Sequence, residues 1–155
     1  MRTIPVQTRN RAEMVDITAQ VRDAVRESGV SSGICVVYCP HTTAAVTINE
    51  NADPDVARDL LMGLDRLAPR DWPYRHGEGN SDAHLKSTLV GCSERILVEE
   101  GRLILGTWQA VYFCEFDGPR QRRVHVKVVA DGVRLADGVR LADGVRLADE
   151  VRPDV

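Results

Sequence analysis

Apolar and polar residues alternate strictly in the stretch that precedes a repeated tail. Every second residue from Val124 to Val128 is a valine, and the residues between them are charged or polar. This alternation predicts a strand of an antiparallel sheet with one buried and one solvated face, over residues 122–129. Runs rich in β-branched and other apolar residues predict further strands over residues 3–8, 33–38, 42–48, 95–99, 102–106 and 109–116.

A first helix is expected to start at Asp16 or Thr18 and to end at Ser28, because Gly29 supplies a stop. Its apolar residues recur at helical spacing and define the face that packs. These residues are Ile17, Val21, Ala24 and Val25.

Asp53-Pro54-Asp55 predicts the start of a second helix, since it supplies an N-cap, a proline at the first helical position and an acid near the positive end of the dipole. The apolar stripe behind it consists of Val56, Leu60, Leu61, Leu64 and Leu67. A short third helix is expected from Ser81 to about Val90, capped by Ser81 or Asp82.

Together these elements predict an α+β fold with a mainly antiparallel, β-sandwich-like core, two longer helices and one short helix. We expect residues 1–129 to form a single domain. Residues 130–155 differ in kind, because Ala-Asp-Gly-Val-Arg-Leu occurs three times in register and a degraded fourth copy follows. A glycine in each copy weakens a helix, so we expect a flexible or partly helical tail, with a short stacked or oligomer-bridging element as the alternative.

Composition narrows the class of protein. The chain has 155 residues, of which 43% are hydrophobic and 28% charged, as in a soluble globular domain. A net charge of -3 argues against binding of a nucleic-acid backbone. No signal-peptide run or membrane span is evident, so we expect a cytoplasmic protein without a membrane partner. The four cysteines are interpreted as reduced and mostly buried, with a metal or redox role as the minority case.

Two polar clusters carry possible chemistry. Pro40-His41-Thr42-Thr43 offers a histidine and two hydroxyls at a break between strands, which suits a phosphate or carboxylate, although a locally bonded turn is the simpler interpretation. The segment 76–86 follows a polar loop that is long enough to suggest function. It brings two histidines, two acids, a lysine and two glycines to a helix N-terminus, where free amides favour an anion. A solvated loop with a capping aspartate is the alternative.

A third cluster lies around Trp108 and at the end of the following strand. Trp108 and Phe116 are interpreted as core or interface residues rather than platforms for a ring. Glu115 lies between Cys114 and Phe116, so partial burial is expected to raise its pKa toward that of a usable acid or base. A simple pair of Glu115 with Arg120 is the alternative.

The chain resembles the YjbQ-like family, named for secondary thiamine-phosphate synthase activity. The residues that carry the resemblance run in order from about residue 3 to residue 129: His41-Thr42-Thr43-Ala44, Ile48-Asn49-Glu50-Asn51, Asp53-Pro54-Asp55-Val56, Asp82-Ala83-His84-Leu85-Lys86-Ser87, Gly101-Arg102-Leu103, Gly106-Thr107-Trp108-Gln109 and Phe113-Cys114-Glu115-Phe116-Asp117-Gly118-Pro119-Arg120. The resemblance implies a compact α+β domain, a homotrimer, and pockets near subunit boundaries. It also implies formation of thiamine phosphate from a pyrimidine diphosphate and a thiazole phosphate, with release of pyrophosphate.

For that reaction we expect roles for two groups of residues. The phosphate-binding set is His41, Thr42, Thr43, Ser81, Lys86 and Arg120. The set for proton transfer or metal contact is His84, Asp82 and Glu115, with Mg²⁺ as a possible cofactor. A metal-dependent hydrolase that holds a transition metal such as Zn²⁺ with His41, His76 and His84 is one alternative, and a non-catalytic protein that binds a phosphorylated metabolite is another.

Overall fold

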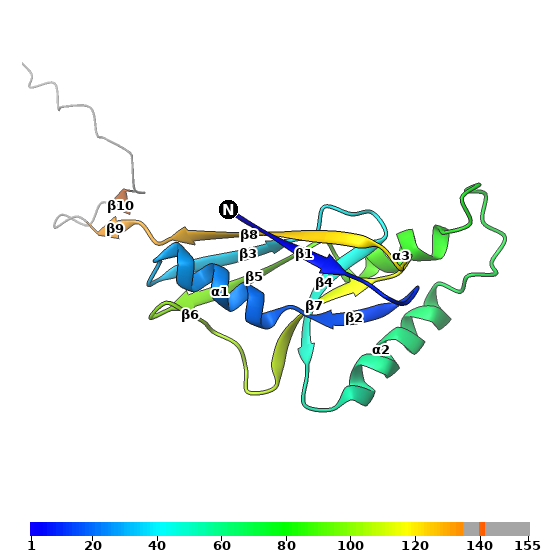
Figure 1. Ribbon diagram of the computed structural model, residues 1–155, viewed down its shortest axis with the longest axis horizontal. Coiled ribbons are helices and arrows are strands. Elements are labelled where there is room, and N and C mark those ends of the chain that lie inside the picture. The colour runs from blue at the N-terminus through cyan, green and yellow to red at the C-terminus, as the bar shows by residue number, and fades with distance from the viewer. Residues whose placement is uncertain (135–139, 142–155) are drawn as a thin grey trace, which may run out of the picture.

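The computed structural model describes residues 1–134, 140 and 141, and arranges them in antiparallel sheets with three helices (Figure 1). The expected α+β class is therefore confirmed. The elements in chain order are β1 (Arg2–Gln7), β2 (Glu13–Asp16), α1 (Thr18–Ser28), β3 (Gly33–Tyr38), β4 (Ala44–Glu50), α2 (Pro54–Leu67), α3 (Ser81–Val90), β5 (Ser93–Glu99), β6 (Arg102–Leu103), β7 (Gln109–Glu115), β8 (Gln121–Ala130), β9 (Val133–Arg134) and β10 (Arg140–Leu141).

Two sheets build the body of the domain. The larger has the strand order β1-β8-β3-β5-β6 and the smaller has the order β2-β7-β4. The principal core forms where the inward faces of both sheets meet, and it includes Val37 of β3, Val46 of β4, Phe113 of β7 and Val124 of β8. Apolar burial between two sheets is the main stabilising term of a sandwich, which agrees with the expected core.

Helix α1 covers this core with the face that its spacing predicts. Ile17, Val21, Ala24 and Val25 are all at most 5% exposed. Helix α2 starts as predicted, because Oδ1 of Asp53 accepts a hydrogen bond from the Asp55 N–H at 2.9 Å. Its stripe is less buried than a core face would be: α2 has no buried residue. Leu61 and Leu64 of α2 instead pack against a second buried cluster, which includes Ala45 of β4 and Cys114 of β7.

Within residues 1–129, the pattern of the sequence misses one strand. Strand β2 has only Met14 and Val15 as apolar residues, and it exists because it pairs with β7 along its full length. The expected tail of residues 130–155 lies largely outside the described residues. Its described parts show that Ala130 ends β8 and that β9 and β10 pair antiparallel. No helix in the described part of the chain is long and apolar enough to span a membrane.

Candidate functional site

Helix α3 buries Ala83 in the second apolar cluster, and polar contacts fix it further against the domain. The Ser87 hydroxyl donates to the backbone oxygen of Ala44 in β4 at 2.7 Å. Nζ of Lys86 donates to carboxylates of Asp65 and Asp82, each at 2.9 Å. These contacts join α3 to β4 and α2, so the position of its N-terminal turn is defined by the fold.

The N-terminus of α3 differs from the expected one. Asn80 occupies the N-cap, where Ser81 or Asp82 is expected, and its side chain makes no capping hydrogen bond. The Asn80 backbone oxygen accepts from the N–H groups of Ala83 and His84, while the Asn80 side chain donates to Oδ2 of Asp117 at 3.0 Å. The amides of Ser81 and Asp82 therefore face the end of the helix, where the dipole favours an anion.

A cavity of about 420 Å³ opens beside this turn and is lined mostly by apolar atoms. Its walls come from Tyr74, His76, Ser81, His84 and Leu85. The rings of His76 and His84 meet edge to face, with centroids 5.4 Å apart. The loop that precedes α3 is itself anchored, because the Tyr74 hydroxyl donates to the Pro69 oxygen at 2.9 Å. The histidines bracketing this loop therefore meet at one recess.

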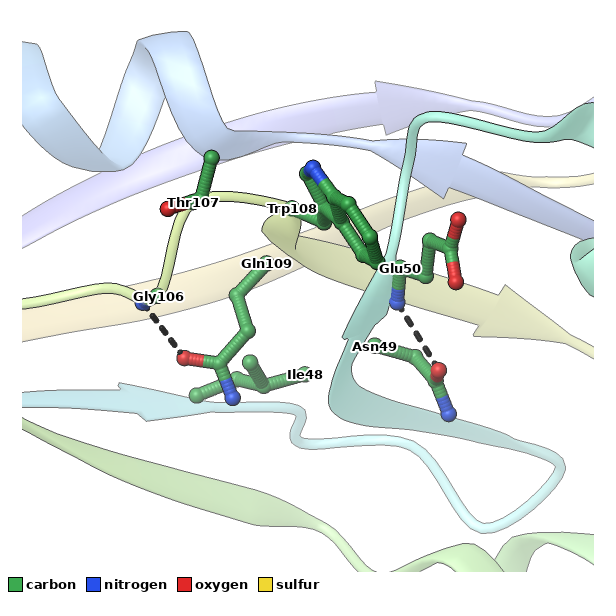
Figure 2. Close-up of a pocket in the computed structure, with 7 residues that line it drawn as sticks. All are labelled: Ile48, Asn49, Glu50, Gly106, Thr107, Trp108 and Gln109. Carbon is green, nitrogen blue, oxygen red and sulfur yellow. Dashed lines mark hydrogen bonds between the residues drawn. The ribbon is translucent and has the colours of Figure 1, made fainter.

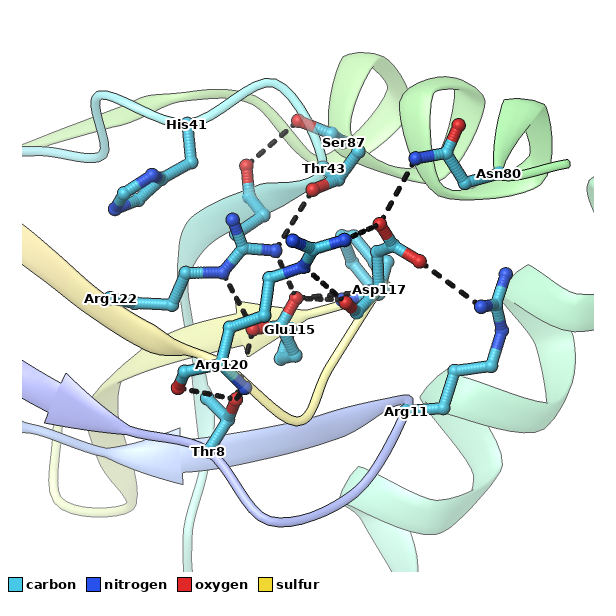
Figure 3. A network of polar contacts seen from close by, with 12 residues as sticks. Thr8, Arg11, His41, Thr43, Asn80, Ser87, Glu115, Asp117, Arg120 and Arg122 are labelled. Carbon is cyan, nitrogen blue, oxygen red and sulfur yellow. Dashed lines mark hydrogen bonds and ion pairs between the residues drawn. The ribbon is translucent and has the colours of Figure 1, made fainter. Parts of the chain in front are cut away.

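Arg120 lies beside the same helix end. Its Nη2 donates to Oδ2 of Asp117 at 2.7 Å, which is the oxygen that also accepts from Asn80 (Figure 3). Its Nε donates to the Asp117 backbone oxygen at 2.7 Å. The side chain is nevertheless 52% exposed, so the guanidinium is held in one orientation while part of it faces solvent. A guanidinium fixed in this way suits a phosphate.

Glu115 does not have the properties that the sequence suggests. Burial alone raises its pKa, but the hydrogen bonds from Arg122 and from the Asp117 backbone N–H outweigh burial and hold the pKa below its ordinary value. The Thr8 hydroxyl donates to the same carboxylate at 3.0 Å. The expected raised pKa is therefore wrong, and the alternative pair with Arg120 is wrong too, because the partner of Glu115 is Arg122.

Two further expected site residues are held in ion pairs. Asp82 is 2% exposed and accepts from Arg11 at 3.0 Å and from Lys86 at 2.9 Å. Lys86 is 5% exposed, and Asp65 is its second partner. These contacts argue against a phosphate-binding Lys86 and against Asp82 as a proton donor, because both charges are already compensated within the protein.

His41 and Thr43 lie on the Arg122 side of the network in Figure 3. Nε2 of His41 accepts from the Arg123 backbone N–H at 3.1 Å. Burial, followed by the nearby charge of Arg122, lowers the pKa of His41, which favours the neutral ring that this hydrogen bond to Nε2 needs. Thr43 is buried and accepts from Arg122 at 2.9 Å, whereas Thr42 is exposed. Of this cluster, Thr42 and the second ring nitrogen of His41 are the groups that remain for a ligand.

The three histidines are only partly brought together. His76 and His84 are in contact, but His41 packs edge-on against Phe113 and bonds to β8. Within the residues described, no three His, Cys, Asp or Glu side chains form a group that could hold a metal ion. His76 has Glu78 as its nearest acidic neighbour, with Nε2 and Oε2 3.7 Å apart.

Sequence reasoning missed the residues that organise this network, although two of them have a clear signal. Arg122 has the same parity in β8 as Val124 and Val126, so it is on the buried face, where a charged residue needs a buried partner. Thr8 likewise follows Ile4 and Val6 at every second position, which puts it on the buried side of the chain. Arg11 and Asn80 have no such signal, because both lie in loops.

Comparison with known proteins gives one consistent result. Residues 2–131 match the family described as UPF0047 protein YjbQ-like. The UPF0047 protein YugU of Bacillus subtilis is 52% identical over 132 residues, which cover 83% of this chain and 98% of the relative. A UPF0047 protein of Methanocaldococcus jannaschii is 53% identical over 126 residues, covering 81% of this chain and 91% of the relative. The crystal structure of an uncharacterized YjbQ/UPF0047 family protein from Clostridium acetobutylicum is similar, with a TM-score of 0.82 and 55% identity over 83% of this chain and all of that one.

Proposed function

This chain belongs to the UPF0047 protein YjbQ-like family, and on that premise we propose that it is an enzyme acting on phosphorylated heterocycles at the N-terminus of α3. The reaction proposed is that of a secondary thiamine-phosphate synthase. In it, a thiazole phosphate and a pyrimidine diphosphate combine to thiamine phosphate and pyrophosphate. A preference for another substrate of the same chemistry would make it a side activity.

One observation supports the proposal above the others. The cavity beside α3 combines apolar walls, two histidines and the amide end of a helix, and Asp117 links Arg120 to Asn80 at that helix end. Apolar walls suit an organic ring, and helix amides with a guanidinium suit the phosphate attached to that ring. Both halves of a phosphorylated heterocycle are therefore accommodated within one small region.

The reaction makes simple demands on such a site. The ring nitrogen of the thiazole attacks the methylene carbon of the pyrimidine, a C–N bond forms, and the C–O bond to the diphosphate breaks with its electron pair leaving on pyrophosphate. The site must hold nitrogen and carbon in line and stabilise the negative charge that develops on the leaving oxygen. We assign the second task to His84, Arg120 and the amides of Ser81 and Asp82. His84 acts as a hydrogen-bond donor to the leaving group.

The carboxylates near the helix end do not favour a bound metal. Asp82 and Asp117 already pair with Arg11, and Glu115 pairs with Arg122, so Mg²⁺ would have to enter with the diphosphate rather than on these side chains. No step of the proposed reaction is assigned to a metal.

A metal-dependent hydrolase is the second candidate, and the contact between His76 and His84 is the observation that favours it. Two histidines at this separation provide part of a Zn²⁺ site, and Glu78 is the nearest further donor, with Oε2 3.7 Å from Nε2 of His76. This candidate predicts zinc that stays with the protein through dialysis. A non-catalytic binding protein predicts instead saturable binding of thiazole phosphate without turnover.

The test is the formation of thiamine phosphate by purified wild-type protein and by variants prepared in parallel. His84→Ala is expected to lower kcat at least about 100-fold. Arg120→Met is expected to raise KM about tenfold, because one phosphate contact is lost. The matched controls are His125→Ala and Lys127→Met, which change the solvated face of β8. Equal rates in His84→Ala and wild type would mean that a contaminant or another site makes the product.

A further inference from the structure

A second candidate site lies where β4 ends and β7 begins, at the opposite end of these strands from Arg122. The turn before β7 is closed by its own residues: Oε1 of Gln109 accepts from the Gly106 N–H at 2.8 Å, and the Gln109 N–H donates to the Gly106 oxygen at 3.0 Å. Trp108 stands at the tip of this turn and is 65% exposed. Of the expected core or interface positions, Phe116 is in the core at 1% exposed, whereas Trp108 is not a core residue of this chain, and an interface position for it stays a prediction.

The backbone beneath Trp108 is rigidly held. The Asn51 N–H donates to the Trp108 oxygen at 2.8 Å. The Asn51 side chain is fixed in turn, because it accepts from the Tyr112 hydroxyl at 2.7 Å and donates to Asp16 at 2.8 Å. A large exposed indole on an anchored turn loses little conformational entropy when a ligand stacks on it.

Figure 2 shows the cavity that this turn forms with the end of β4. It has a volume of about 560 Å³, and its walls include Trp108, Ile48, Asn49 and Glu50. Glu50 is the only titratable residue in the lining. Among the described residues, no Lys, Arg or His side chain forms an ion pair with this carboxylate.

We propose that this cavity binds a planar heteroaromatic cation, which stacks on Trp108 and places its positive charge near Glu50. Tryptophan is the strongest aromatic partner for a cation, and an unpaired carboxylate adds direct attraction. The same carboxylate disfavours a phosphate, for which the lining offers no cationic side chain. The charge preference of this site is therefore opposite to that of the α3 cavity.

The two sites cannot be two ends of one small ligand within a chain. Glu50 lies six residues along β4 from Ala44, where the α3 network begins, which corresponds to about 20 Å of strand. Binding of a cation at this cavity therefore does not depend on the proposed synthase reaction and is tested separately.

The test uses the full chain with Trp72→Phe, so that Trp108 is the only one of the two tryptophans left to report. N-methylpyridinium is the cationic probe, and benzenesulfonate is an anionic probe of similar size. We expect saturable quenching of the Trp108 fluorescence by the cation and no saturable effect of the anion. Adding Glu50→Gln to this protein is expected to weaken binding of the cation about tenfold. Adding the matched surface change Glu27→Gln is expected to leave the affinity for the cation unchanged.

Three results would overturn the inference. Quenching that rises linearly with probe concentration would show collision without binding. Equal affinities in the Glu50→Gln and Glu27→Gln proteins would remove the role of the carboxylate. A Trp108 emission maximum that moves with protein concentration, without saturable quenching, would show that a second copy of the chain covers the indole.

Discussion

Arg122, near the start of β8, and Glu115, at the end of β7, form a buried ion pair with two hydrogen bonds. Nε of Arg122 donates to Oε2 of Glu115 at 2.7 Å, and Nη2 donates to Oε1 at 2.6 Å. Their side chains are 9% and 0% exposed. Since β7 and β8 belong to different sheets, this pair joins the sheets at the edge where the α3 network begins.

The first prediction concerns this pair. Glu115→Gln leaves the Arg122 charge buried without its partner, so it should lower the free energy of unfolding by about 3–5 kcal/mol. Denaturant unfolding measures the change. The matched control is Glu27→Gln, which removes an exposed partner of Arg2 and should change stability by no more than about 0.5 kcal/mol. Similar losses in both variants would contradict the structural role of the pair.

Acid should weaken the fold through the same network. The pKa of Glu115 and that of Asp117 are both below their ordinary values, because arginines and amide donors outweigh the effect of burial. Their stabilisation is therefore complete above the unfolded pKa values of about 4 and is lost as the pH falls through the lower folded values. Denaturant midpoints measured from pH 7 to pH 3 should fall in the acid range. In Glu115→Gln the denaturant midpoint should fall less steeply with decreasing pH. An unchanged slope would contradict the contribution of Glu115 to the acid sensitivity.

Only one cysteine should react quickly with a thiol reagent. Cys92 is exposed, whereas the other three are buried. Burial raises the pKa of Cys35 and of Cys39 to about 11 and that of Cys114 to about 12, so little thiolate is present at pH 8. Titration of the native protein with a chromogenic aromatic disulfide should show one rapidly reacting thiol. In denaturant all four thiols should react. Cys92→Ser should abolish the fast phase; a fast phase that survives would contradict these burial assignments.

The repeated tail should be dispensable for assembly. We propose that the chain forms a homotrimer and that residues 133–155 are not needed for it. The cut is placed after residue 132 because Ala130 belongs to β8 and the Asp131 N–H donates to the Ser32 oxygen. Light scattering should give a trimer mass for both the full chain and the shortened chain. Loss of trimers on truncation would favour the oligomer-bridging alternative.

Much of the fold follows from local pattern. The valines of β8, the apolar face of α1 and the Asp53 cap of α2 are each visible in the sequence, because burial and capping act over a few residues. The short strand β2 is not visible, since its existence depends on pairing with β7.

The site is less predictable because it depends on which charges meet. Glu115 and Arg122 are seven positions apart, and the turn between β7 and β8 brings them together instead of Glu115 and Arg120. Lys86 has two acidic partners, and one of them, Asp65, comes from α2. Sequence can mark Arg122 as inward-facing, but the choice of partner is decided by the packing of the sheets.

The most direct measurement of the central claim is a product balance by phosphorus NMR on pyrimidine diphosphate and thiazole phosphate with the purified protein. Wild type and His125→Ala should release pyrophosphate and form thiamine phosphate in equal amounts and at equal rates, while His84→Ala should form both at least about 100-fold more slowly. Pyrophosphate or phosphate without thiamine phosphate would indicate a hydrolase, and product formation that is unchanged in His84→Ala would contradict catalysis at the α3 cavity.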